Sequence, residues 1–210
     1  MNNLSAIIRR YPTIKSKTYV LLRYILLPFK CIEPYLPKKG FIVDLGSGYG
    51  SYDIYFALRE SKRKIVGLEL IKSRVNIAKQ ASKGIKNVNF KPQDFTKDSK
   101  IKSADAICML DFIHHIPYPT QEVILRECFK KLKKNGLLII KDIAEKPRWK
   151  FLHNYIHDKI MTKNDKLYFL KMGELMQKLN DIKFKVVQCP IIIKTYPLNP
   201  IPHYIIICKK

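Results

Sequence analysis

The segment from Phe41 to Gly50 constrains the fold of this chain more than any other part of the sequence. Its first residues are apolar and predict a short buried strand, with Asp44 at the carboxyl end. Three glycines follow at alternate positions: Gly46, Gly48 and Gly50. They allow a tight turn in which the backbone comes close to a ligand, and roughly Ser51 to Glu60 continue as a helix. The segment predicts a strand, a turn and a helix in direct succession.

The turn also carries a fixed negative charge, which limits the kind of ligand. The helix would point its first N–H groups at the ligand, and Asp44 would lie beside it. A cradle for phosphate alone would not favour this carboxylate, whereas a cradle for a cationic ligand would. The spacing departs from the dinucleotide fingerprint G-x-G-x-x-G, because position 51 is Ser and the third glycine comes one residue early.

Further apolar runs follow at intervals typical of alternating strands and helices: 64–70, 88–90, 106–110 and 137–140. This alternation predicts a parallel sheet covered on both faces. The first of these runs ends near Glu69, whose carboxylate suits the two hydroxyls of a ribose. Helices are expected over 148–160 and 171–179, and a further helix is expected to be capped by Thr120 and to end at Gly136. Strands over 184–189 and 204–208, with no helix between them, predict an antiparallel pair or strands that lie apart.

From about Leu36 to its C-terminus, the sequence resembles the class I S-adenosylmethionine-dependent methyltransferases. The matching pieces occur in order along the chain: Asp44–Gly50, Glu69, Asp94-Phe95, Leu110–Ile116 and Lys134–Ile140. The resemblance implies S-adenosyl-L-methionine as the cofactor. It also implies a Rossmann-like α/β three-layer sandwich, whose seven-stranded sheet is mostly parallel with a reversed C-terminal strand.

The resemblance assigns roles to the cofactor-binding candidates. Gly46 and Gly48 would face the methionine part of the cofactor, and Asp44 would lie near its ammonium. Glu69 would hold the ribose hydroxyls, while Asp94 and Phe95 would contact the adenine edge. Taken alone, Asp94 would more often form an Asx-turn or a helix cap. The full expected set is Asp44, Gly46, Ser47, Gly48, Tyr49, Gly50, Glu69, Leu70, Asp94, Phe95 and Leu110.

Four residues after the fourth and fifth strands are the catalytic candidates: Asp111, His114, His115 and Asp142. Methyl transfer from a sulfonium depends mainly on alignment, which can supply ~7–11 kcal/mol, and needs a base only where the acceptor loses a proton. A capping or stacking role remains the alternative for the two histidines. His153, His157 and Asp158 would line the acceptor pocket or lie at the surface. No metal is expected, because Ile143 follows Asp142 where a second oxygen ligand would be needed.

The stretch from Asp111 to Pro117 bears on the acceptor. It lacks the Asn/Asp-Pro-Pro-aromatic loop of enzymes that methylate amino groups on adenine or glutamine, and no Pro-Cys follows the strand. It instead resembles small-molecule, quinone and lipid methyltransferases of the ubiquinone-biosynthesis type. We therefore expect a small-molecule or lipid-like acceptor, methylated at O, N or C. An RNA methyltransferase and a catalytically silent S-adenosylmethionine-binding protein are the alternatives.

The net charge of +23 favours a polyanionic partner, such as RNA or an anionic membrane surface. The basic residues are mostly Lys, whereas bidentate contacts to phosphates and bases prefer Arg, so nucleic acid is the less expected partner. Compositional drift is the other explanation of the charge. The five cysteines form no C-x-x-C pair and indicate reduced thiols in a cytoplasmic protein.

Residues 1–39 differ from residues 40–210, the expected methyltransferase domain. They hold eight basic residues and one acid, Glu33. Their apolar run, Tyr19 to Phe29, is interrupted by Arg23 and is too short to span a membrane. No small-residue cleavage site follows it, so a signal peptide is not expected. We expect a helical lid that faces the substrate, and peripheral contact with anionic lipid is compatible with that role.

Overall fold

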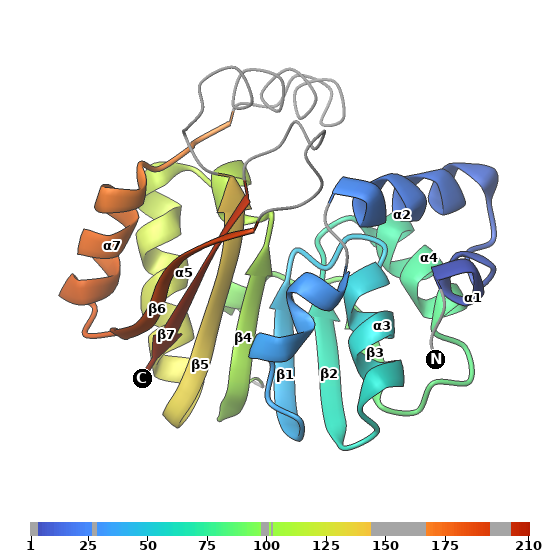
Figure 1. Cartoon of the computed structure of the whole chain (residues 1–210), viewed down its shortest axis with the longest axis horizontal. Helices are drawn as coiled ribbons and strands as arrows, with labels where there is room; N and C mark the ends of the chain where they lie inside the picture. The colour runs from blue at the N-terminus through green and yellow to red at the C-terminus, as the bar shows by residue number, and fades with distance from the viewer. Residues whose placement is uncertain (1–3, 27–28, 98–100, 102, 144–166, 194–202) are drawn as a thin grey trace. The chain divides into compact units, whose positions relative to one another are not determined.

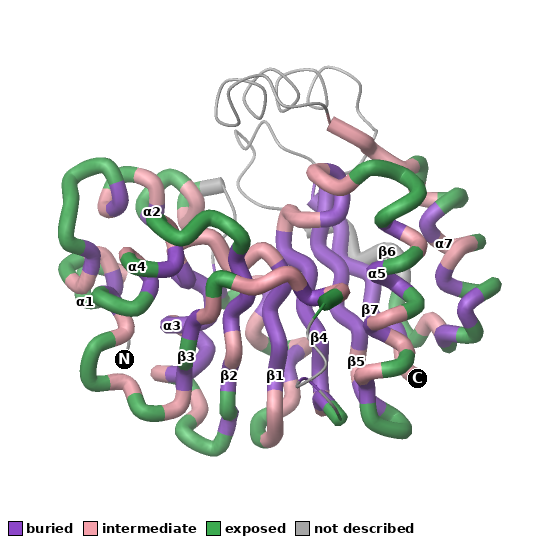
Figure 2. The backbone as a smooth tube through the Cα atoms, turned by 180° about the vertical axis from the view of Figure 1, so that it is seen from behind, coloured by how far each residue is buried: buried purple, intermediate pink, exposed green. Residues whose placement is uncertain are grey.

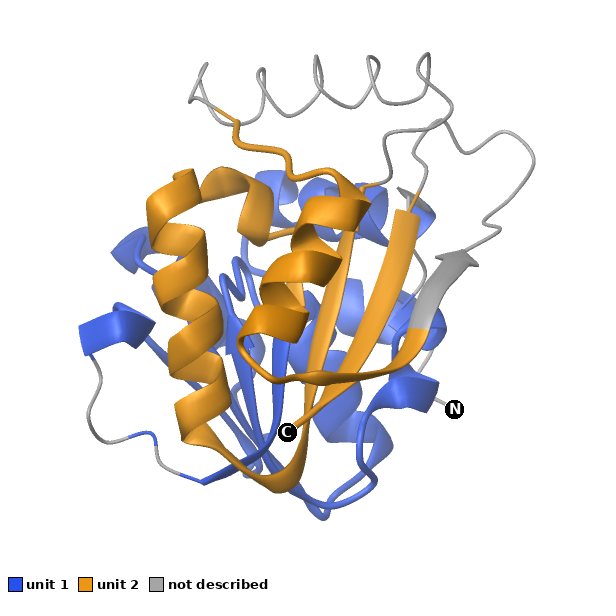
Figure 3. Ribbon diagram, turned by 90° about the vertical axis from the view of Figure 1, so that its left-hand side faces the viewer, with its two compact units in different colours: residues 1–108 blue, residues 109–210 orange. Residues whose placement is uncertain are grey.

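The computed structural model describes residues 4–26, 29–97, 101, 103–143, 167–193 and 203–210. Residues 1–108 and 109–210 form two compact units (Figure 3), and each is described by itself. The strands belong to one seven-stranded sheet in the order β3-β2-β1-β4-β5-β7-β6 (Figure 1). No helix among the residues described here is long and apolar enough to cross a membrane.

The first unit is built around parallel strands: β1 (Gly40–Leu45), β2 (Arg63–Leu68) and β3 (Val88–Lys91). Two helices join them, and they are α3 (Ser51–Arg59) and α4 (Lys72–Ala81). Both contact the sheet through fully buried apolar side chains, among them Ile54 and Ala78. The strand β4 (Ala104–Leu110) begins in this unit, and a short 3₁₀ turn, η3 (Phe95–Lys97), precedes it.

The N-terminal segment is helical and packs onto the first unit. It contains α1 (Leu4–Ile8), α2 (Ile14–Leu26) and two 3₁₀ turns, η1 (Phe29–Cys31) and η2 (Glu33–Tyr35). The buried Arg63 donates to the carbonyl of Pro37 at 2.8 Å and to the carboxylate of Glu33 at 2.9 Å. The segment is thus tied to β2 by a charged side chain that is itself 1% exposed.

The second unit contains the reversed strand. The strand β7 (His203–Lys209) runs antiparallel both to β5 (Leu132–Ile143) and to β6 (Lys185–Ile193). Two helices cover these strands, and they are α5 (Tyr118–Lys131), which contacts β5, and α7 (Met172–Asp181), which contacts β6. A 3₁₀ turn, η4 (Ile113–His115), follows β4. The predicted Rossmann-like three-layer fold with its reversed C-terminal strand is confirmed.

The prediction for the limits of α5 was wrong at both ends. The residue at its N-cap is Pro117, so Thr120 lies inside the first turn. The helix ends at Lys131 because Leu132 is extended and buried and begins β5, which places Gly136 inside a strand. The predicted helix over 148–160 lies outside the described residues.

Candidate active site

The glycine turn folds back against the end of β2. The φ angles of Gly46, Gly48 and Gly50 are 73°, 56° and 71°, in the left-handed region that suits glycine. The N–H groups of Gly46 and Ser47 both donate to the carbonyl of Leu68, at 2.8 and 3.0 Å. The strand, turn and helix predicted from the sequence are present, and the turn is held in place by backbone hydrogen bonds.

Two of these glycines differ in what surrounds them. A Cβ on Gly50 would lie 2.4 Å from the ring of Phe90, which is fully buried, so packing alone requires glycine there. A Cβ on Gly48 would meet only the hydroxyl of Tyr19, at 3.7 Å. Packing against Phe90 therefore explains the glycine at position 50, whereas the space beside Gly48 is open.

Glu69 connects the turn to the segment after β2. One carboxylate oxygen accepts from the N–H of Gly48 at 3.1 Å, and the other accepts from the N–H of Ile71 at 2.9 Å. Arg74 Nη1 lies 3.6 Å from Oε2 of Glu69, the oxygen that accepts from Gly48. Each carboxylate oxygen can accept a second hydrogen bond, so the group retains capacity for ligand hydroxyls. Its expected contact with a ribose stays a prediction.

A pair of buried carboxyl groups lies beneath the turn. Asp44 and Asp53, which are 4% and 1% exposed, are hydrogen-bonded to each other through their side chains. Burial, and next the neighbouring Asp53, raises the pKa of Asp44 well above its usual value, while Arg23 on α2 opposes this. Burial raises the pKa of Asp53 to about 7. The buried environment therefore favours the protonated form of these two carboxyl groups.

The polar atoms at this place fit a ligand that brings donors and positive charge. Asp44 Oδ1, Ser47 Oγ and Asp53 Oδ2 are buried and have no hydrogen-bond partner in the described part of the chain. Leaving a buried acceptor unsatisfied costs about 1–3 kcal/mol. An ammonium group would supply both the missing donors and the compensating charge.

The remaining cofactor candidates follow β2 and β3. One oxygen of Asp94 accepts from the backbone N–H of Thr96 at 2.9 Å and from its hydroxyl at 2.7 Å, which is the Asx-turn considered above. The ring of Phe95 is buried, whereas Leu70 is 67% exposed at the end of β2. Asp94 thus has a structural role in addition to any contact with adenine.

The N-terminal segment also contributes to the surroundings of the glycine turn. The sequence analysis did not single out the three residues involved, which are Tyr11, Tyr19 and Arg23. The hydroxyl of Tyr11 donates to the carbonyl of Tyr49 at 3.1 Å, and the ring of Tyr19 meets the ring of Tyr49 edge-on at 4.8 Å. Arg23 acts on the charge of Asp44, as described. No local sequence signal marks these residues, because they are far from the glycine motif along the chain.

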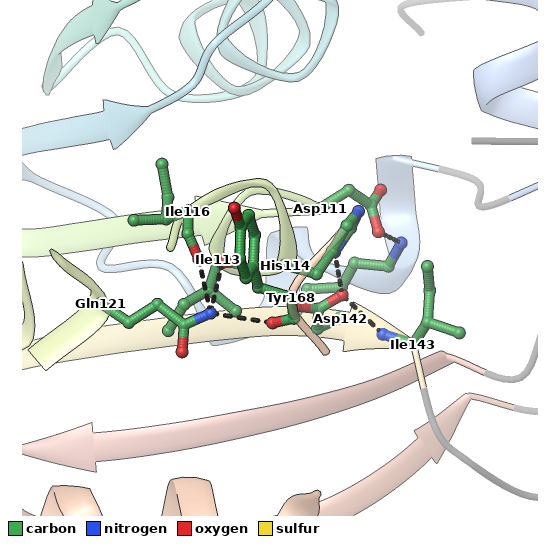
Figure 4. Close-up of polar contacts among 9 residues, drawn as sticks. Asp111, Ile113, His114, Ile116, Gln121, Asp142, Ile143 and Tyr168 are labelled. Carbon is green, nitrogen blue, oxygen red and sulfur yellow. Dashed lines mark hydrogen bonds and ion pairs between the residues drawn. The ribbon is translucent and has the colours of Figure 1, made fainter. Parts of the chain in front are cut away.

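In the second unit, the structure brings together all four catalytic candidates. His114 Nδ1 lies 2.6 Å from a carboxylate oxygen of Asp142, and both residues are buried (Figure 4). The backbone N–H of Ile143 donates to the same oxygen at 2.8 Å. The ring of His114 is 4.1 Å from that of His115 and is stacked on Phe169. The stacking alternative for the histidines is therefore realised together with a buried hydrogen bond between His114 and Asp142.

Asp111 forms a second pair with Lys141, which is 1% exposed. The φ of Asp111 is 57°, and its N–H donates to the carbonyl of Lys141 at 2.9 Å. A left-handed conformation is uncommon for residues other than glycine and concentrates at functional sites. The sequence analysis missed Lys141, although a lysine inside an apolar strand was a signal that could have found it.

A further missed residue, Gln121 on α5, positions η4, the turn that carries His114 and His115. Its buried amide nitrogen lies within 3.1 Å of the carbonyl of Ile113 and within 2.8 Å of those of Ile116 and Tyr168 (Figure 4). The N–H of Tyr168 in turn donates to the carbonyl of His114 at 2.8 Å. The amide therefore joins the turn after β4 to the segment that carries Phe169.

The candidates are divided between the units. Leu110 and the four catalytic candidates belong to the second unit, and the other cofactor candidates belong to the first. His153, His157 and Asp158 lie outside the described residues. Within the described ranges, no group of three or more His, Cys, Asp or Glu side chains is placed to hold a metal ion. A cavity of about 190 Å³ in the first unit is lined by Leu4, Ile7, Tyr24, Phe29, Lys30 and Tyr55, none of them a candidate.

Comparison with known proteins connects this architecture to one family. The model of a family described as a methyltransferase domain matches residues 37–195. A phosphoethanolamine N-methyltransferase of Plasmodium falciparum is 28% identical over 117 residues, which are 54% of this chain and 44% of that protein. An O-methyltransferase of Penicillium aethiopicum is 33% identical over 107 residues, which are 50% of this chain and 24% of that protein. The chain thus spans less than half the length of these two relatives.

A solved structure shows the same fold. The magnesium protoporphyrin IX methyltransferase of Synechocystis, crystallised with S-adenosylhomocysteine, superimposes with a TM-score of 0.67 at 18% identity, over 95% of this chain and 88% of that one. The chain belongs to the methyltransferase-domain family. By family and fold, it is a class I S-adenosylmethionine-dependent methyltransferase domain.

Proposed function

We propose that this protein transfers a methyl group from S-adenosyl-L-methionine to a small-molecule or lipid-like acceptor. The observation that carries the proposal is the buried pair of His114 and Asp142, joined at 2.6 Å, in a chain of this family. A histidine held by a carboxylate in this way is the arrangement of a general base.

The residues at the glycine turn are proposed to hold the cofactor. Asp44 and Ser47 offer buried acceptors to its ammonium, and Glu69 keeps capacity for the ribose hydroxyls. The exposed Leu70 offers an apolar surface at the end of β2. When bound, S-adenosylmethionine supplies an electrophilic methyl group on a sulfonium. Leu110, at the end of β4, remains a proposed cofactor contact.

His114 is proposed to take the proton that leaves the acceptor. When the ring donates its Nδ1 proton to Asp142, the lone pair of the neutral imidazole is on Nε2. The proton of an acceptor hydroxyl or amine would move to this nitrogen as the new bond to carbon forms. Asp142 then stabilises the imidazolium, because its carboxylate remains beside the ring.

Asp111 and His115 are proposed to orient the acceptor. Asp111 is 17% exposed at its side chain, unlike its buried partner Lys141, so it can meet a polar group of a ligand while Lys141 holds it in place. One relative is named for phosphoethanolamine, and this small phosphorylated amine supports a small-molecule substrate. The two relatives are an N- and an O-methyltransferase, so their names do not fix the accepting atom.

Residues 1–39 are proposed to act as the helical lid that faces the substrate. Tyr11, Tyr19 and Arg23 reach the glycine turn and the buried Asp44, so a change in this segment acts directly on the turn. A cytoplasmic location is proposed from the thiols. Cys31, Cys108 and Cys128 are free thiols, and burial raises the pKa of Cys108 and Cys128.

Calorimetry with S-adenosylmethionine and with S-adenosylhomocysteine tests the cofactor step. Both should bind the folded protein, and absence of heat with either would contradict the proposal. Transfer of labelled methyl should then be measured with phosphoethanolamine, a phenol, a quinol and RNA. Transfer to one of the first three supports the proposed acceptor class, whereas transfer to RNA alone overturns it.

A further inference from the structure

The helix α2 presents an apolar stripe that no part of the described structure covers. Ile14 is 84% exposed, Leu21 38%, Leu22 47% and Ile25 52%. Exposed stretches of α2 are green in Figure 2. At 3.6 residues per turn, these positions and Thr18 lie on one face of the helix, while the buried Ser16 and Val20 lie on the other. A helix that only packed onto its own domain would carry polar residues on that outer face.

The charge that interrupts this run in the sequence does not interrupt the stripe. Arg23 lies on the opposite side of α2, with its guanidinium 5.2 Å above the ring of Tyr52. The aromatic residues at the end of the run also point inward. Phe29 is fully buried, and its ring is 5.2 Å from that of Tyr24. The available apolar surface is therefore aliphatic.

Basic residues border the stripe on both sides. At 100° per residue, Lys15 falls beside Leu22 and Lys17 falls beside Leu21. Arg9, which precedes the helix, is exposed as well. Neither α1 nor α2 contains an acidic residue, and the first acid of the chain, Glu33, is already paired with Arg63. The face is thus apolar along its centre and positive along its edges.

We propose that this face of α2 docks onto the surface of an anionic lipid bilayer. A helix with an aliphatic face and a lysine border lies in the plane of the interface, with its apolar side chains among the acyl chains and its lysines at the lipid phosphates. The interaction depends on the surface of α2 alone, so it does not require that the acceptor be a lipid.

The same features disfavour the other occupants. RNA would contact the lysines but would leave the aliphatic side chains in water, and the stripe carries no aromatic residue on which a base could stack. A second copy of the chain would bring an identical positive border, in a protein of net charge +23. Only a surface that is both anionic and apolar matches the whole face.

Flotation of the full chain with vesicles tests this proposal. Vesicles that contain phosphatidylserine in phosphatidylcholine should bind the protein, and vesicles of phosphatidylcholine alone should bind it far more weakly. Added salt should weaken the binding, because it shortens the distance over which the lysines attract lipid phosphates, which is ~8 Å at physiological ionic strength. The double variant Leu22→Ser/Ile25→Ser should bind the anionic vesicles about tenfold or more weakly, since two inserting side chains are lost.

The double variant Val123→Ser/Val187→Ser is the matched control, because these valines are 49% and 53% exposed outside α2. It should bind vesicles as the unchanged protein does. Equal melting temperatures and equal affinities for S-adenosylmethionine would show that both variants are folded. The proposal is overturned if anionic vesicles do not bind the protein, if the α2 variant binds them unchanged, or if the stripe instead mediates a dimer that the α2 variant dissociates.

Discussion

At the scale of single residues, the buried carboxyl pair of Asp44 and Asp53 is the most unusual feature of the chain. Two acids that share a proton are unfavourable in a core unless a ligand or a function requires them. Their unpaired oxygens and their place under the glycine turn support the proposed ammonium site. Because burial raises the pKa of both groups, the pair also has a consequence for stability.

The stability of the ligand-free protein should fall as the pH rises from about 4 to about 7, the range over which the pKa of Asp53 is raised. A carboxyl whose pKa is raised by folding stabilises the native state below its unfolded pKa, and this contribution is lost as the pH rises through the folded pKa. In Asp53→Asn, only Asp44 of the pair still titrates, so this variant should lose less stability over the same pH range. The difference between the two losses can reach on the order of 4 kcal/mol. Urea denaturation at a series of pH values measures it, and parallel curves for the two proteins would contradict the shared proton.

Glu69 should matter for the turn as well as for the ligand. In Glu69→Ala, the N–H groups of Gly48 and Ile71 lose their acceptor, and the affinity for S-adenosylmethionine should fall by roughly 2–3 kcal/mol. Glu69→Gln keeps one acceptor oxygen and should lose less. Calorimetry measures both, with Glu127→Ala on α5 as the control. A loss in Glu69→Ala no larger than in this control would exclude Glu69 from the site.

At the scale of elements, the ends of β4 and β5 bring the reactive groups of the second unit together. The turn η4 carries His114 and the end of β5 carries Asp142, while Gln121 on α5 fixes the carbonyls of the turn. Adjacent strands of an open α/β sheet present the residues at their carboxyl ends to the same place. The histidine turn is therefore positioned by three elements.

Asp142→Asn should reduce methyl transfer about 10²–10⁴-fold on an acceptor that carries a proton, because the amide does not stabilise the imidazolium. The affinity for S-adenosylmethionine should stay unchanged, since Asp142 is not among the proposed cofactor contacts. Glu127→Ala on α5 is the control, and equal rates in the two variants would mean that the pair of His114 and Asp142 has no special role.

At the scale of the whole molecule, the N-terminal segment is an integral part of the first unit. Ile7, Tyr11, Val20 and Phe29 are each at most 1% exposed. The ring of Phe29 packs against Tyr52 and Tyr55 of α3 at 4.9 and 5.3 Å. The same segment presents an exposed aliphatic face on α2. One side of the segment therefore packs into the core, and the other side is exposed.

Phe29→Ala should lower the free energy of unfolding by about 3–5 kcal/mol, because it leaves a large cavity in a closely packed aromatic cluster. Leu22→Ala, on the exposed face of the same segment, should change it by less than about 0.5 kcal/mol. Chemical denaturation measures both. Similar small effects in the two variants would show that the segment is only loosely attached.

The sequence by itself determined the order of the strands and helices, the glycine turn and the positions at which a ligand is expected. These features are encoded locally, since apolar runs and glycine spacing act over a few neighbouring residues. The limits of α5 were predicted wrongly because Thr120 is a good cap and Gly136 a good terminator, yet burial of Leu132 in the sheet outweighed both.

Only the tertiary structure decided which side chains meet. Asp53 joins Asp44, Lys141 joins Asp111 and Gln121 holds the turn of His114, although no local pattern links the members of any pair. The guanidinium of Arg23 on α2 likewise lies over the ring of Tyr52 on α3. Such contacts depend on packing between elements that are distant along the chain, which propensity and periodicity do not contain.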